Sequence, residues 1–397
     1  MNKRHRMIAP LLPIAACLIG GMVASLYVSI SATWLLGALA VAIISTLLLH
    51  HRPRWQTAGI YFCNVGIGML LAMRPALPTP QVLQRAEGHM LDYRTQLLDT
   101  YRQQGISDTD YAILAAMTMG DKSELTRDVR EVYNTTGAGH ILALSGLHLG
   151  ILYMLISALT RGVRWRMMSQ ILTIIAIWAF AMLTGLSSSV VRSATMLTVY
   201  GLLSLGYRRG TSVNVLAFTA IVMLVVTPES LWDVGFQMSF LAMLGILLFF
   251  PLLYELIPPH YLQAHRGLRL LWSMTLLSLT AQAGVAPLIA FYFHHFSTYF
   301  LLSNFVVVPC AYVILLGASV LLVTGLAPVA VVLTHTIRSM NSALEWIAAL
   351  PMASIDGLHP SVVQTELLYV LIACIYILFR IFLPDGQPTA DSTPNAA

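Results

Sequence analysis

Charged residues are scarce in this sequence. Only 10% of its 397 residues are Asp, Glu, Lys or Arg, whereas 57% are hydrophobic. A soluble globular protein carries about 25% charged residues, which cover its surface. The shortage of charge therefore excludes a cytosolic enzyme, a secreted disulfide-rich protein and a disordered chain.

Cysteine is also rare, and several catalytic motifs are missing. The four cysteines lie far apart in apolar stretches without a CxxC pair, so we expect neither a disulfide framework nor a zinc site. The sequence contains no GxxxxGK[ST] nucleotide-binding motif, no HExxH and no HxHxDH. We therefore expect no cofactor, no resident metal ion and no catalytic residue, and we interpret the chain as a membrane transport protein rather than an enzyme.

Long apolar runs dominate what is present. A membrane-spanning helix needs about 20 mostly apolar residues, and twelve segments approach this requirement. They predict an all-α, polytopic membrane helix bundle of about 11–12 transmembrane helices. The predicted spans are 8–28, 32–49, 57–73, 139–160, 168–186, 189–206, 212–227, 235–257, 271–293, 299–325, 329–349 and 366–383.

The positions of Lys and Arg predict the topology. Basic residues gather in short cytoplasmic loops of membrane proteins, and here they occur at both ends and in alternate loops, which places both termini in the cytoplasm. The span 329–349 contains Arg338 and Glu345, so it is expected to line a polar interior or to lie at the interface. The basic positions are Lys3, Arg4, Arg6, Arg52, Arg54, Arg161, Arg164, Arg166, Arg208, Arg209, Arg266, Arg269 and Arg380.

Four segments follow from this pattern: membrane helices in 1–73, an outward-facing amphipathic helical segment in 74–138, a membrane core in 139–383 and a disordered tail in 384–397. Residues 74–138 hold seven basic and nine acidic residues. Three short helices are expected there, each with one apolar side against the membrane core. They are predicted over 90–104, from the Ser107 cap to Gly120, and over 123–135.

A conspicuous polar block is TGAGHILALSGLHLG, residues 136–150. If it is helical, His140, Leu144 and His148 share one ridge, with Ser145 beside them. This stripe would face a hydrated interior, or the histidines would be satisfied by neighbouring carbonyl groups; the sequence leaves both open. A metal site is less favoured because no third ligand lies nearby. An intramembrane serine hydrolase is also disfavoured, because His148 is too near Ser145 in sequence to be a base from a separate helix.

A second block, LTGLSSSVVRSA (183–194), places Ser188 and Arg192 near the start of a span. A cation at a helix N-terminus is locally unfavourable, so a negative group should compensate it. A transported phosphate is one candidate, and a structural ion pair with Asp233 or Glu229 is the other.

The third group of polar residues predicts a wet path. Asp233 marks a span boundary, and Gln237 lies just inside it, where a helix–helix hydrogen bond is the ordinary role. Gln282 and Asn304 lie in spans interrupted by proline, and broken helices are tolerated where they line a cavity or are buried in protein. The candidate path residues are His140, Ser145, His148, Ser188, Arg192, Asp233, Gln237, Gln282 and Asn304.

These blocks resemble the competence domain of the ComEC family, the inner-membrane DNA channel of natural transformation. The matching stretches are TGAGHILALSGLHLGIL (136–152), LTGLSSSVVRSATM (183–196), PESLWDVGFQMSFLAMLGI (228–246) and AQAGVAPLIAFYFHHFS…LLSNFVVVP (281–309).

The resemblance implies a multi-pass protein of the bacterial inner membrane, in contact with membrane lipid, that passes single-stranded DNA. It also implies an external DNA receptor and a cytoplasmic motor ATPase as partners, and a homo-oligomer is compatible with it. Family members commonly add an OB-type domain and a metallo-β-lactamase-like nuclease domain, and this sequence resembles the membrane core alone. A transporter or flippase for a smaller anionic or lipid-linked substrate remains the alternative.

Overall fold

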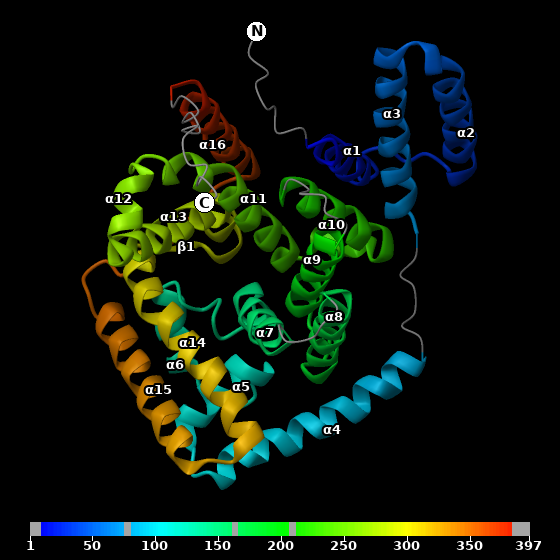
Figure 1. Cartoon of the computed structure of the whole chain (residues 1–397). Coiled ribbons are helices and arrows are strands. Elements are labelled where there is room, and N and C mark those ends of the chain that lie inside the picture. Colours follow the sequence, from blue (N-terminus) through cyan, green and yellow to red (C-terminus); the bar gives the residue numbers. More distant parts are fainter. Residues whose placement is uncertain (1–8, 75–80, 161–165, 206–211, 383–397) are drawn as a thin grey trace, which may run out of the picture.

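The computed structural model describes residues 9–74, 81–160, 166–205 and 212–382 (Figure 1). Within these ranges the fold is all-α, as predicted, with sixteen α-helices and one two-stranded sheet. The α-helices are α1 (Leu11–Ala24), α2 (Ala32–Leu48), α3 (Pro53–Ala72), α4 (Gln81–Gln103), α5 (Asp108–Met119), α6 (Arg127–Thr135), α7 (Gly146–Leu159), α8 (Arg166–Leu183), α9 (Ser188–Leu205), α10 (Ser212–Val226), α11 (Val234–Tyr254), α12 (Pro259–Ala264), α13 (Arg266–Phe293), α14 (Phe300–Thr324), α15 (Ala327–Ala348) and α16 (Val362–Phe382).

Each of the twelve predicted spans coincides with a helix. Five described segments are long and apolar enough to cross a membrane: α2 with the short 3-10 helix η1 (Leu49–His51), α11, α13, α14 and α16. Shorter apolar helices are α1, α7, α8 and α10. The predicted tail 384–397 and the basic positions 3–6, 161–164 and 208–209 lie outside the described residues.

Two helix crossings depend on glycine. A Cβ atom on Gly284 of α13 would lie 2.2 Å from the carbonyl oxygen of Leu241 in α11, and one on Gly245 would lie 2.4 Å from that of Thr280. The crossing of α1 and α3 is equally close at Gly21 and Gly68. Because lipid supplies no hydrophobic drive between helices, such close backbone contact is a main source of their association.

The longest helix, α13, contains Pro287, which cannot donate a backbone hydrogen bond within the helix. Beside this position, the hydroxyl of Tyr369 in α16 donates to the carbonyl oxygen of Gly284 at 3.0 Å. Pro287 therefore lies close to the point where α16 is attached to the α11–α13 pair, and α13 continues past it.

Helices α14 and α15 form an antiparallel pair (Figure 1). Their buried residues repeat at alternating intervals of three and four, the spacing of a coiled-coil seam. Helix α15 contains Arg338 and Glu345, but neither belongs to its buried seam residues, so the helix can still pack against α14. The seam residues are Val307, Ala311, Ile314, Ala318 and Leu321 in α14, and Ala330, Leu333, Ile337, Met340, Leu344 and Ile347 in α15.

Helix α5 differs from the expected amphipathic helix with one apolar side. Ser107 and Gly120 bound this helix as predicted, but the Ser107 side chain makes no cap hydrogen bond and lies 3.1 Å from the Asp108 carboxylate instead. Every residue from Tyr111 to Met119 is buried. The helix shares one hydrophobic core with α14 and α15 instead of lying on a membrane surface with one side exposed. Its run YAILAAMTM has no polar side, so burial all round is the favourable arrangement.

Ion pairs fasten α4 to the turn after α5. The guanidinium of Arg94 lies 3.4 Å from the carboxylate of Asp121, and Arg102 pairs with Glu124. Burial alone would raise the pKa of Asp121, but hydrogen bonds from Ser123 and the charge of Arg94 together lower it. The carboxylate is therefore held in its charged form, which keeps the attachment of α4 intact.

The single described sheet joins two loops far apart in sequence. Strand β1 (His295–Ser297) pairs antiparallel with β2 (Ser354–Asp356), with Phe296 opposite Ile355. The hydroxyl of Ser297 also donates to the carbonyl oxygen of Asn134 at 3.0 Å. These contacts connect the α13–α14 and α15–α16 loops to the C-terminal end of α6.

Candidate functional site

The predicted ridge through residues 140–148 is wrong. Helix α7 begins at Gly146, so His140, Leu144 and Ser145 lie in a loop and do not share a helix face with His148. Gly137 has φ +76°, and a Cβ atom there would lie 3.1 Å from the Cβ of Ser297 and 3.2 Å from that of Phe300.

The loop before α7 contributes side chains to two hydrophobic cores. Ile141 and Leu142 enter the core of α5, α14 and α15, whereas Leu144 enters the core of α8 and α9. A continuous helix would hold these side chains at fixed angles around one axis, whereas the loop directs them to both cores.

Ser145 and His148 form a local pair at the start of α7. Nδ1 of His148 lies 2.9 Å from the hydroxyl of Ser145 and 3.2 Å from its backbone nitrogen, so this ring nitrogen accepts from both. The arrangement is a capping box, which satisfies free N–H groups of the first turn. The neutral ring then carries its proton on Nε2, which is buried without a partner among the described residues.

The hydrogen bonds of this capping box also bear on the hydrolase alternative. The pair is close enough for proton transfer, but the Nδ1 lone pair is already engaged by a backbone N–H group. The arrangement therefore has an ordinary structural role as a helix cap.

Arg192 and Asp233 form the ion pair that was one of the two predicted alternatives. Nη1 of Arg192 in α9 lies 3.7 Å from Oδ1 of Asp233, and the same nitrogen donates to the hydroxyl of Ser188 at 3.1 Å. The Ser188 hydroxyl lies 3.4 Å from the other carboxylate oxygen of Asp233. The three residues therefore form one connected network between α9 and α11.

Asp233 has a second role as the N-cap of α11. Its Oδ1 accepts a hydrogen bond of 2.8 Å from the backbone nitrogen of Phe236. The carboxylate thus neutralises Arg192 where the positive end of the helix dipole would otherwise repel the guanidinium. Arg192 reaches the start of this helix, because a Cβ on Gly235 would lie 3.1 Å from its Nη2.

The burial of this pair is unequal. The Arg192 side chain is 4% exposed and that of Asp233 is 40% exposed. Arg192 is the one Arg or Lys among the described residues whose side chain is buried, and its Nε has no hydrogen-bond partner there. An unsatisfied buried donor costs about 1–3 kcal/mol, so the site would gain stability from an additional acceptor.

Gln237 connects α11 to α13, the ordinary role considered for it. Its amide nitrogen donates to the carbonyl oxygen of Leu231 at 2.9 Å, and its amide oxygen accepts from the hydroxyl of Tyr292 at 3.0 Å. Tyr292 is not among the predicted path residues; its polar tip is the signal for this hydrogen bond.

The remaining predicted residues lie apart from this network. Asn304 donates to Ser278 at 3.1 Å, and its amide oxygen is buried without a partner among the described residues. Gln282 is half-buried and has no recorded side-chain hydrogen bond in the described part of the chain. His140 is exposed, with Nδ1 3.0 Å from the carbonyl oxygen of Gly137.

The structure thus places four of the nine candidates around the start of α11 and two more at the start of α7. The four are Ser188, Arg192, Asp233 and Gln237, and the two are Ser145 and His148. The two places adjoin, because α7 packs on α9 and a Cβ on Gly146 would lie 3.3 Å from the Ser193 hydroxyl. No group of three or more His, Cys, Asp or Glu residues that could hold a metal ion occurs among the described residues. The arrangement offers buried N–H donors, which suit an anionic or hydrogen-bond-accepting group.

We predict that Asp233→Asn destabilises the protein more than Arg192→Gln does. Asparagine keeps the helix cap, but the buried guanidinium loses its counter-charge. This loss costs about 3–5 kcal/mol in a fully buried pair and less here, because Asp233 is 40% exposed. Removal of Arg192 instead leaves a carboxylate that reaches solvent. Thermal unfolding of the purified variants in detergent measures the difference, and the double variant should resemble Arg192→Gln. An equal or larger loss for Arg192→Gln alone would contradict this account.

Parts of this chain are similar to proteins of several bacteria. The ComE operon protein 3 of Bacillus subtilis (strain 168) is 32% identical over 198 residues, which are 50% of this chain and 24% of that protein. An uncharacterized protein of Aquifex aeolicus (strain VF5) is 31% identical over 157 residues, 39% of this chain and 37% of its own.

The third relative is the uncharacterized protein YcaI of Escherichia coli (strain K12), 22% identical over 207 residues, 50% of this chain and 27% of its own. The matched regions therefore span well under half the length of these relatives. No solved structure matches. The family model described as competence protein matches residues 117–382, which include α7 to α16 and all nine candidate residues. The chain therefore belongs to the competence protein family, the ComEC family.

Proposed function

We propose that the chain passes single-stranded DNA through the bacterial inner membrane into the cytoplasm. The observation that carries the proposal is the family match over residues 117–382. This region includes the buried Arg192, whose Nε has no hydrogen-bond partner in the described part of the chain. A phosphodiester supplies the acceptor atoms that such a donor lacks. The predicted topology, with both termini in the cytoplasm, belongs to this proposal.

The charge pattern is compatible with conduction. DNA carries one negative charge per nucleotide and cannot cross hydrocarbon without a hydrated path. Conduction also requires weak contacts, because a strongly cationic lining would retain the strand. One buried arginine among the described residues, already paired with Asp233, meets this requirement better than a cluster of cations would.

Partners complete the proposal. Strand transport needs a source of DNA and a driving force, so the proposed partners are an external DNA receptor and a cytoplasmic motor ATPase, with self-association into a homo-oligomer.

The test is DNA entry in a transformable host whose corresponding gene is deleted. Labelled DNA bound outside should be unchanged, while nuclease-protected DNA in the cytoplasm should be lost and then restored by the wild-type chain. Unchanged entry without the chain would contradict the proposal and favour the carrier for a smaller anionic or lipid-linked substrate.

A further inference from the structure

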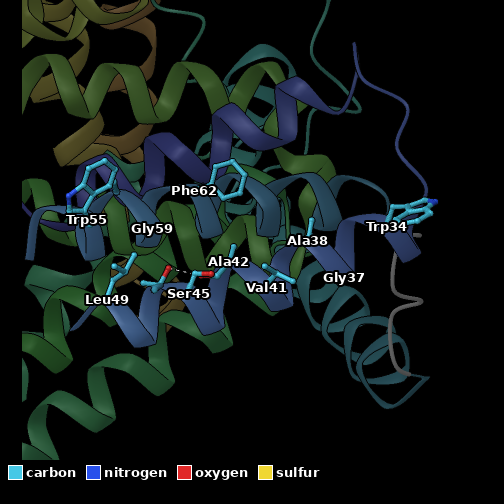
Figure 2. Close-up of a pocket in the computed structure, with 12 residues that line it drawn as sticks. Trp34, Gly37, Ala38, Val41, Ala42, Ser45, Leu49, Trp55, Gly59 and Phe62 are labelled. Atoms are coloured by element: carbon cyan, nitrogen blue, oxygen red, sulfur yellow. Dashed lines mark hydrogen bonds between the residues drawn. The ribbon is translucent and has the colours of Figure 1, made fainter. Parts of the chain in front are cut away.

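An open, apolar groove is lined by residues of α2, η1 and α3, none of which belongs to the polar network. Figure 2 shows Trp34 at one end and Leu49 with Trp55 at the other. Its volume is about 920 Å3, and small residues of α2, Gly37 and Ala42 among them, line it between these ends. The small side chains leave space along the groove, and the large side chains of Trp34, Leu49 and Trp55 bound it at the ends.

The length of the groove matches the membrane. The fifteen helical steps from Trp34 to Leu49 rise about 22 Å, most of the ~30 Å hydrocarbon core. Tryptophan is enriched where the bilayer meets water, and Trp34 and Trp55 are both exposed at the ends. An occupant would therefore lie along the bilayer normal with its polar part at one interface.

One end of the groove carries positive charge. The turn between Leu49 and Trp55 contains His50, His51, Arg52 and Arg54, all exposed. The ion pairs of the described residues involve other arginines, so Arg52 and Arg54 have no carboxylate partner among them. Basic residues beside a membrane helix attract anionic headgroups.

We propose that this groove binds an anionic phospholipid, with an acyl chain between α2 and α3 and the headgroup phosphate at Arg52 and Arg54. An apolar helix from another protein would fill the groove but would leave both arginines without a counter-charge. A lipid satisfies both parts of the site. The proposal does not depend on what the chain transports.

Native mass spectrometry of the full chain tests this site. The detergent-solubilised protein is titrated with phosphatidylglycerol and with phosphatidylcholine of the same acyl chains. We expect preferential retention of phosphatidylglycerol, and a roughly fivefold loss of that retention for each of Arg52→Gln and Arg54→Gln. Phosphatidylcholine retention should fall less in these two variants, because its choline cation offsets the charge of its phosphate. Equal retention of both lipids by the wild type would overturn the proposal.

A pair of glycine variants tests the groove itself. Gly37→Leu should fill it without a clash, because a Cβ there meets nothing within 4 Å. The matched control is Gly20→Leu in α1, equally unobstructed but outside the groove. We expect loss of bound phosphatidylglycerol only for Gly37→Leu. Equal retention by both variants, or a change of oligomeric mass instead of lipid content, would overturn the proposal and favour a partner helix.

Discussion

Arg192→Gln is expected to reduce DNA entry at least tenfold, and up to about a hundredfold, while the protein remains folded in the membrane. A hydrogen bond from a charged group is worth about 1.5–3 kcal/mol, and Arg192 is the buried cation of the described chain. Its removal leaves Asp233, 40% exposed, free to contact solvent, so folding should be affected less than transport. The readout is nuclease-protected DNA per cell, normalised to the membrane-inserted protein.

The matched control is Arg338→Gln. Arg338 also pairs with a carboxylate, that of Asp110 at 2.8 Å, but its side chain is 67% exposed and lies on α15. DNA entry should stay near wild type in this variant, and Arg192→Lys should retain part of it because the charge remains. Wild-type entry with Arg192→Gln at normal protein level would contradict the role proposed for this residue.

Gly284→Leu is expected to prevent the assembly of α11, α13 and α16. The new Cβ would lie 2.2 Å from the backbone oxygen of Leu241, which cannot move without separating the two helices. The hydrogen bond from Tyr369 to Gly284 would be lost as the helices separate. Overpacking of a close contact costs about 1–3 kcal/mol and more where backbone must shift. The expected result is a large loss of monodisperse protein after detergent extraction.

Gly267→Leu is the control in the same helix. A Cβ at Gly267 meets nothing within 4 Å, so this variant changes hydrophobicity and helix propensity by the same amount without a steric conflict. It should be extracted as a monodisperse protein at the wild-type level. If both variants behave alike, the close approach of α11 and α13 does not decide stability.

Local sequence signals predicted most of the helices. Each of the twelve apolar runs coincides with a helix, because burial of an apolar run in lipid requires that its backbone groups be bonded within the segment. Local sequence also located Ser107 and Gly120 at the ends of α5. The unfavourable position of Arg192 indicated a negative partner, with Asp233, Glu229 or a transported phosphate as candidates, and the structure pairs it with Asp233. These features depend on a few neighbouring residues or on a single uncompensated charge.

Tertiary packing decided the rest. The loop 138–145 reads as the start of a span, yet it is not helical because Ile141 and Leu144 belong to different cores. Helix α5 is enclosed by helices more than 180 residues away in sequence, and β1 pairs with a strand from a distant loop.

The sequence by itself therefore determined where helices form, since hydrophobicity and caps act within a few residues. The tertiary structure decided which faces meet and which donors remain without a partner, since these depend on contacts between segments distant in the chain.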